Sequence, residues 1–180
     1  MNEFIKPKEC IVISDSNIHF QDFYDKPYLS EATRAEIKKA DILLVAEDGW
    51  RGIDHPVFPE ETSDFFAFLK ANLVDDVVPD ICIEDENYQL LELHADVVNL
   101  PTMIALYAAL PILTSVIGNY VYDLLKRKRD DCNIVMKIVV QKNGSSKSIE
   151  YNGPAKWFEK NLMNVTNSLF DENDDDETNS

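Results

Sequence analysis

Acidic side chains follow three apolar segments of this sequence, at the point where each segment ends. Asp15 comes after CIVIS, Glu47 and Asp48 after DILLVA, and Glu84 and Asp85 after VVPDICI. Short apolar segments are typical of strands, and parallel neighbouring strands place their carboxyl ends along one edge of a sheet. Carboxylates gathered there can hold Mg²⁺, together with water and substrate phosphates. One hypothesis is therefore a magnesium site made of these five carboxylates.

A magnesium ion at that edge would organise in-line attack on a phosphate or phosphodiester. The catalytic candidates are then Asp15, His19, Asp48 and His55. A competing interpretation is that these are solvated loop residues, because 33 of the 180 residues are acidic and aspartate favours loops for its own backbone hydrogen bonds. The sequence contains no glycine-rich phosphate loop and no GxSxG motif, so it specifies no reaction.

A second group of candidates lies in the long segment EDGWRGIDHPVFPEET. Trp50, Arg51, Asp54 and His55 occur within six residues of one another there, between glycines and prolines that favour a loop. A loop with these side chains can form a recognition surface, which makes the four residues binding candidates. The alternative is an ordered structural loop in which Trp50 and Phe58 close the end of the sheet.

The charge of the chain restricts its partners. The formal net charge is -16, and six acidic residues stand in the last ten positions. Such a surface repels phosphate backbones and anionic lipids, so we expect no direct nucleic-acid binding. A basic partner protein or a cation is easier to accommodate. The oligomeric state is not indicated.

The cysteines and the N-terminal residues indicate a cytoplasmic protein. Cys10, Cys82 and Cys132 are far apart, stand in apolar surroundings and form no CxxC pair, which is typical of buried thiols in a reducing compartment. The first 14 residues, MNEFIKPKECIVIS, mix charged and apolar side chains, and this pattern is unlike that of a cleaved secretory signal.

The pattern of segments predicts a single α/β domain over residues 1–170. Residues 1–99 read as a mostly parallel sheet with flanking helices, in which CIVIS is a strand buried on both faces. Residues 100–130 read as a long apolar helix, and 131–170 as a β-hairpin followed by a helix. Asn143 and Gly144 mark the hairpin turn, although the serines beside them suggest a loop longer than two residues. The last ten residues, 171–180, are expected to be a disordered acidic tail.

The apolar segment over residues 102–125 is long enough to cross a bilayer and is followed by the basic run KRKR. Pro111, Gly118 and Asn119 dilute its apolar character, and strand-like segments stand on both sides of it. These features favour the buried helix of a soluble core over a membrane span.

Three functions fit these patterns. The first is a non-enzymatic interaction or sensing module that acts with a partner protein and needs no cofactor. The second is a magnesium-dependent phosphoryl hydrolase or nuclease that uses the strand-end carboxylates. The third, a membrane-tethered accessory protein, requires the 102–125 segment to span.

Overall fold

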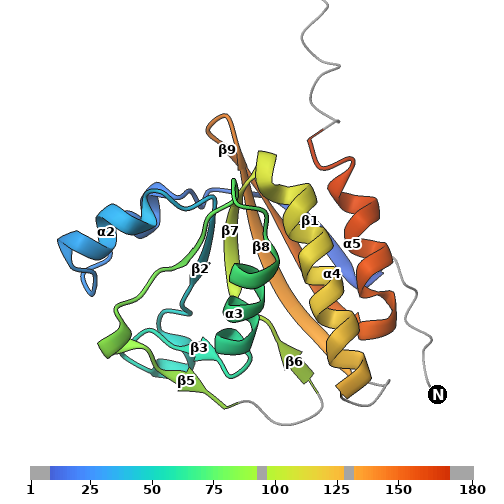
Figure 1. Ribbon diagram of the computed structural model, residues 1–180, viewed down its shortest axis with the longest axis horizontal. Coiled ribbons are helices and arrows are strands. Elements are labelled where there is room, and N and C mark those ends of the chain that lie inside the picture. The colour runs from blue at the N-terminus through green and yellow to red at the C-terminus, as the bar shows by residue number, and fades with distance from the viewer. Residues whose placement is uncertain (1–8, 93–96, 128–131, 171–180) are drawn as a thin grey trace, which may run out of the picture.

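The computed structural model describes residues 9–92, 97–127 and 132–170. Within them the chain forms a mixed sheet with helices on both faces and a second, two-stranded sheet (Figure 1). The predicted disordered tail, residues 171–180, lies outside the described residues. The strands are β1 (Ile11–Ser16), β2 (Ile42–Val45), β3 (Phe58–Pro59), β4 (Pro79–Ile81), β5 (Leu90–Leu91), β6 (Val97–Asn99), β7 (Thr102–Leu106), β8 (Asn133–Lys142) and β9 (Ser145–Pro154). The α-helices are α1 (Gln21–Tyr24), α2 (Glu31–Ile37), α3 (Thr62–Asn72), α4 (Leu110–Arg127) and α5 (Phe158–Thr166).

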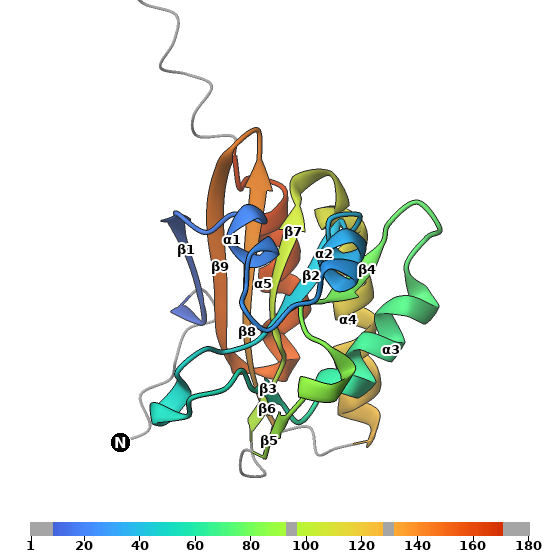
Figure 2. The same ribbon diagram turned by 90° about the vertical axis from the view of Figure 1, so that its left-hand side faces the viewer.

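The main sheet has the strand order β1-β9-β8-β7-β2-β4, and the short strand β6 also pairs with β8. β1 is antiparallel to β9, β9 to β8, and β7 to β2, whereas β7 is parallel to β8 and β4 to β2. The α/β class is thus confirmed, but the predicted mostly parallel sheet is not, because the sheet is mixed. The physical reason is that the C-terminal hairpin β8-β9 enters the sheet between β1 and β7, which separates β1 from β2 (Figure 2).

β1 is an edge strand, not the doubly buried strand that its apolar sequence predicted. Its four central residues, 12–15, are all exposed, with Val12 at 54% and Ile13 at 43% of full exposure. These two residues point to opposite faces of the sheet, because side chains alternate along a strand. Among the described residues, neither face of the sheet is therefore fully covered at this edge.

The predicted helix over residues 100–130 begins later than expected. Thr102–Leu106 is strand β7, a 3₁₀ turn follows at Tyr107–Ala109, and α4 starts at Leu110. β7 lies between β2 and β8, so Met103, Ile104 and Ala105 are buried on both faces and read as a continuous apolar run. Such a run cannot be told from a buried helix by periodicity alone. Pro111 lies in the first turn of α4, where its missing N–H costs little.

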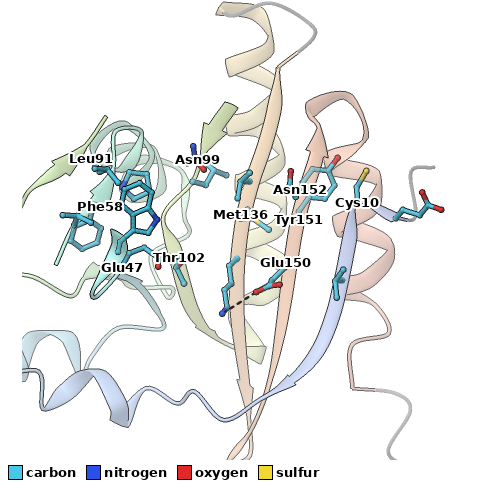
Figure 3. Close-up of a pocket in the computed structure, with 18 residues that line it drawn as sticks. Cys10, Glu47, Phe58, Leu91, Asn99, Thr102, Met136, Glu150, Tyr151 and Asn152 are labelled. Atoms are coloured by element: carbon cyan, nitrogen blue, oxygen red, sulfur yellow. Dashed lines mark hydrogen bonds and ion pairs between the residues drawn. The ribbon is translucent and has the colours of Figure 1, made fainter. Parts of the chain in front are cut away.

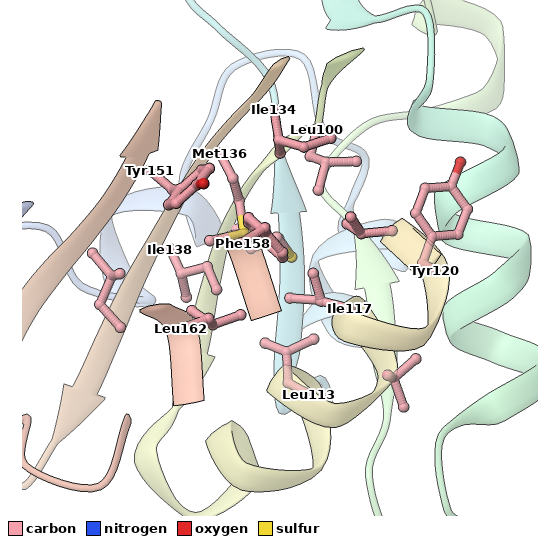
Figure 4. Close-up of a cluster of buried hydrophobic side chains, with 14 of the residues drawn as sticks. Leu100, Leu113, Ile117, Tyr120, Ile134, Met136, Ile138, Tyr151, Phe158 and Leu162 are labelled. Atoms are coloured by element: carbon pink, nitrogen blue, oxygen red, sulfur yellow. The ribbon is translucent and has the colours of Figure 1, made fainter. Parts of the chain in front are cut away.

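α4 supplies much of the main hydrophobic core. Leu113 and Ile117 project from it toward Met136 and Ile138 of β8, whereas the Tyr120 ring lies edge-on to Phe65 and Phe68 of α3 (Figure 4). The helix over Tyr107–Arg127 is long and apolar enough to cross a membrane by length and composition, but a core helix passes the same test. Of its most apolar window, 56% is buried inside the fold, which is consistent with a soluble protein.

The C-terminal hairpin and helix form as predicted, with a shorter turn. The register pairs Lys142 with Ser145, so the turn consists of Asn143 and Gly144 alone, with φ values of 50° and 79°. Positive φ at both central residues is the geometry that Asn-Gly favours in a two-residue hairpin. Phe158 and Leu162 of α5 are buried against the sheet, and the Phe158 ring lies edge-on to Tyr151 of β9 with centroids 4.9 Å apart.

Candidate functional site

A cleft of about 440 Å³ lies between the loop that carries Trp50 and the uncovered half of the main sheet. We call it the Trp50 cleft. The side chains drawn in Figure 3 come from β1, β8 and β9 on one side, from the loop, β3 and β5 on the other, and from β6 and β7 between them. Its lining includes Glu9, Val12, Glu47, Trp50, Lys137 and Glu150.

The floor of the cleft is a row of three side chains on adjacent strands. Val12 of β1 pairs with Glu150 of β9, and Glu150 pairs with Lys137 of β8. The Lys137 ammonium lies 3.5 Å from a Glu150 carboxylate oxygen, and the two side chains are 36% and 53% exposed. They alternate along their strands with Met136 and Tyr151 of the main core, so they face away from α4 and α5.

Within the described part of the chain, helices cover only the other half of this face. Leu43 and Val45 of β2 are buried in a second hydrophobic cluster with Phe20, Leu29 and Ile37, which come from α1, α2 and the chain around them. Figure 2 shows α1 and α2 over this part of the sheet, in front of the strands. The Val12, Glu150 and Lys137 row lies beyond that cluster, which leaves a solvent-exposed floor.

The wall of the cleft is the loop between Glu47 and Val57. These two residues form an isolated antiparallel bridge, in which the Glu47 N–H donates to the Val57 carbonyl at 3.0 Å and the Val57 N–H donates back at 3.3 Å. Between them the backbone turns through positive φ at Gly49 (69°), Arg51 (48°) and Gly52 (77°). Two of these positions are glycines, which adopt this conformation without a steric cost.

Trp50 is held at the surface of this loop and remains partly exposed. The Arg51 guanidinium lies 4.2 Å from the centre of the Trp50 ring, a cation–π contact. Phe58, in contrast, is fully buried, and its ring lies 5.3 Å from that of Tyr88. Phe58 therefore anchors the loop, whereas the exposed part of Trp50 is available to a ligand in the cleft.

The cleft is acidic. Its described lining contains three carboxylates, from Glu9, Glu47 and Glu150, and one ammonium, from Lys137. One Glu47 oxygen accepts a hydrogen bond of 3.1 Å from the Thr102 hydroxyl, which orients the carboxylate. Net negative charge at an open site attracts cationic groups.

The other loop candidates lie outside the lining of the cleft. Asp48 pairs with Lys26 at 2.7 Å, an ion pair between the loop and the turn before α2. Asp54 and His55 are exposed. Of the four predicted binding residues, Trp50 lines the cleft and Arg51 stacks on the Trp50 ring. Asp54 and His55 are not among the described residues that line the cleft.

The strand-end carboxylates are not brought together by the sheet. β1 runs antiparallel to β2 and β4, so Asp15 lies at the opposite end of the sheet from Glu47 and Glu84, and three strands stand between β1 and β2. The parallel arrangement on which their clustering depended is therefore wrong for β1 and Asp15, whereas β2 and β4 are parallel neighbours and end on the same side of the sheet. In the part of the chain that the structure describes, no group of three or more His, Cys, Asp or Glu side chains is placed to hold a metal ion. Magnesium binding itself stays a prediction.

The remaining candidates have local structural contacts. The two ring nitrogens of His19 each lie 2.9 Å from a carbonyl oxygen, that of Asn17 and that of Gly144, so His19 joins the segment after β1 to the hairpin turn. Glu84 accepts a 2.5 Å hydrogen bond from the Ser30 N–H at the start of α2, and this bond lowers the pKa of the Glu84 carboxyl. Asp85 begins the 3₁₀ turn Asp85–Asn87.

Sequence reasoning missed the floor of the cleft. Lys137 and Glu150 stand among apolar residues in MKIVV and SIEY. A charged side chain within a strand-like apolar segment must reach solvent or a partner, so this signal could have identified both residues as exposed positions. Their pairing could not be found in this way, because it depends on the register of the hairpin.

No protein-family model, curated protein or solved structure matches this chain.

Proposed function

We propose that this chain is a non-enzymatic, intracellular interaction module that binds a segment of a partner protein in the Trp50 cleft. The observation that carries the proposal is the uncovered row of Val12, Glu150 and Lys137 facing a partly exposed tryptophan. Tryptophan is enriched among residues that dominate binding energy at interfaces, and apolar contacts surrounded by polar groups are the usual composition of such sites.

The charge of the cleft favours a partner segment with lysine or arginine. Glu9, Glu47 and Glu150 line it, and the whole chain has a formal net charge of -16. Electrostatic attraction of this kind increases the rate of encounter and disfavours acidic competitors. The same charge disfavours nucleic acid as the occupant.

Replacement of Trp50 tests the proposal. The affinity-tagged full-length chain and its Trp50→Ala variant are used to co-purify proteins from cells, and the recovered proteins are quantified by mass spectrometry. We expect a specific basic protein to be lost with Trp50→Ala. The matched control is Tyr122→Ala, because Tyr122 is a 57% exposed aromatic residue on α4, which covers the other face of the sheet. Equal loss with both variants would contradict a role for the cleft.

The intracellular location is supported by the burial of all three cysteines. Burial raises the pKa of the Cys82 thiol to about 12, so this thiol is unreactive at neutral pH. The membrane-tethered alternative is tested by expression of the chain without detergent, followed by high-speed centrifugation. We expect the chain to stay in the supernatant, because α4 is part of the core.

A further inference from the structure

The outer edge of β1 has backbone groups that point away from the sheet. The Asn152 N–H donates to the Cys10 carbonyl at 2.9 Å, and the register places these two residues opposite each other. In an antiparallel pair, hydrogen-bonded residues alternate with residues whose N–H and C=O point to the other side. The groups of Val12 and Ser14 therefore point toward β9, and those of Ile11, Ile13 and Asp15 point outward. No described residue outside β1 makes a backbone hydrogen bond to these outward groups.

The two edges of the sheet differ in how they are protected. β4, at the far edge, has only three residues and begins with Pro79, and both features discourage pairing with another strand. β1 has six residues and no proline, and it exposes Val12 on one face and Ile13 on the other. An exposed edge of this kind is a template for an added strand.

We propose that β1 accepts an extended segment of the partner as an eighth strand of the sheet, with a lysine or arginine of that segment opposite Asp15. This inference rests on the proposed function and names the form of the partner. The cleft and the edge are continuous, because Val12 lines the cleft and is also an exposed residue of β1. A strand added there places every second side chain on the cleft face, beside Val12 and toward Glu150.

The negative charge of Asp15 and of the whole chain favours a basic segment as the added strand. Asp15 is exposed, and its cross-strand neighbour Lys147 lies over the ring of Phe170 at 5.7 Å and makes no ion pair with Asp15. A cation directly opposite Asp15 on a new strand would complete a favourable cross-strand pair. A second copy of this chain would add another net charge of -16 and, in pairings centred on β1, bring Ile11 or Ile13 opposite Asp15. A basic segment of a different protein therefore fits better.

The experiment is a selection from a random-sequence peptide library displayed on phage, with the full-length chain as the target. We expect enriched peptides to combine β-branched residues with lysine or arginine. Their affinity is then measured by fluorescence polarisation against wild type, Trp50→Ala, Ile13→Pro and Ile13→Ala. Ile13→Pro removes an outward N–H and leaves the hydrogen bonds between β1 and β9 intact. A carbonyl of the bound peptide then loses its hydrogen-bond donor, which should weaken peptide binding about tenfold. Ile13→Ala keeps the N–H and should bind within about threefold of wild type.

Asp15→Lys is a second variant that leaves the backbone unchanged, so the test holds even if Ile13→Pro folds poorly by circular dichroism. Basic peptides should bind this variant about two- to fivefold more weakly, and repeat selection should favour acidic peptides. Peptides that require Trp50 but bind Ile13→Pro and Asp15→Lys normally would overturn strand addition and leave the proposed function intact. Peptides that bind Trp50→Ala as well as wild type, or a selection without enrichment, would count against both strand addition and the proposed function. A wild-type dimer that Ile13→Pro converts to a monomer, measured by light scattering, would show that the edge belongs to a second copy.

Discussion

Lys137 and Glu150 are direct partners across β8 and β9, and their charged ends meet at 3.5 Å on the open floor of the Trp50 cleft. Both side chains are more than one-third exposed, so water screens the pair. We expect Lys137→Gln to lower the free energy of unfolding by less than about 1 kcal/mol, measured by urea denaturation. A loss above about 2 kcal/mol would contradict an open floor.

The same substitution should strengthen the binding of basic peptides. Lys137 provides the ammonium among the described lining residues, and its removal leaves the three carboxylates of the cleft less compensated. Glu150→Gln should have the opposite effect and weaken the same peptides. Parallel titrations of the two variants check the sign, and equal responses would show that these charges do not face the ligand.

The close approach of Cys10 to Gly153 predicts that a larger side chain at position 153 destabilises the fold. A Cβ atom at position 153 would lie 2.5 Å from the Cys10 sulfur and 2.8 Å from the Cys10 Cβ. Gly153→Ala should therefore destabilise the fold by about 1–3 kcal/mol, since the backbone must shift to relieve the overlap. Thermal unfolding measures this effect, and a Cys10→Gly second substitution should restore part of the loss.

Gly118→Ala is the matched control for that experiment. The added Cβ would meet the flexible Glu159 side chain at 3.3 Å, and alanine is the better helix former by about 1 kcal/mol. We expect an unchanged or slightly higher melting temperature. If Gly153→Ala behaved like this control, the close approach of Cys10 to β9 would be wrong.

Glu84 predicts a pH dependence of stability. The hydrogen bond from the Ser30 N–H lowers the pKa of Glu84 in the folded chain below its ordinary value of 4.5. A lowered folded pKa means that the stabilisation is present above the unfolded pKa and is lost as the pH falls through the folded pKa. Wild type should thus be more stable than Glu84→Gln at pH 7, and the difference should shrink below pH 4.5. A difference that stayed constant down to pH 2 would refute the role of the carboxylate charge.

The magnesium hypothesis has its own test. The proposed interaction module predicts no rise in melting temperature when Mg²⁺ or Mn²⁺ is added to the purified chain. A rise that Asp15→Asn abolishes would support the alternative, because Asp15 belongs to the predicted metal set. Differential scanning fluorimetry of both proteins, with and without the ions, gives the answer.

Local features of the fold could be predicted from the sequence. Ser30 caps α2 by accepting the Thr33 N–H, and Asn143-Gly144 forms the hairpin turn, because each depends on residues close together in the chain. The position of β1 could not be predicted, since it depends on a hairpin more than a hundred residues later. β7 was mistaken for helix for a related reason: a strand buried on both faces has no alternation.

The residues of the candidate site likewise divide into those that local sequence identifies and those that only the tertiary fold brings together. Trp50 was predicted as a binding residue of its loop and Glu47 as a metal ligand at a strand end, and both line the cleft. Lys137, Glu150 and Val12 come from three strands that only the tertiary fold brings together. The prediction that Asp15 lies close to Glu84 was wrong, because the relative direction of two strands cannot be read from the sequence of either strand.

The most direct test of the central claim is to map peptide binding on the ¹⁵N-labelled full-length chain by NMR. A peptide from the phage selection is titrated in, and backbone amide and tryptophan indole shifts are followed. The Trp50 cleft predicts the largest changes at the Trp50 indole and at the amides of Val12, Lys137 and Glu150, all of which line it. Changes confined to Tyr122 and Met163, which are exposed on α4 and α5, would contradict the claim, because those helices cover the other face of the sheet.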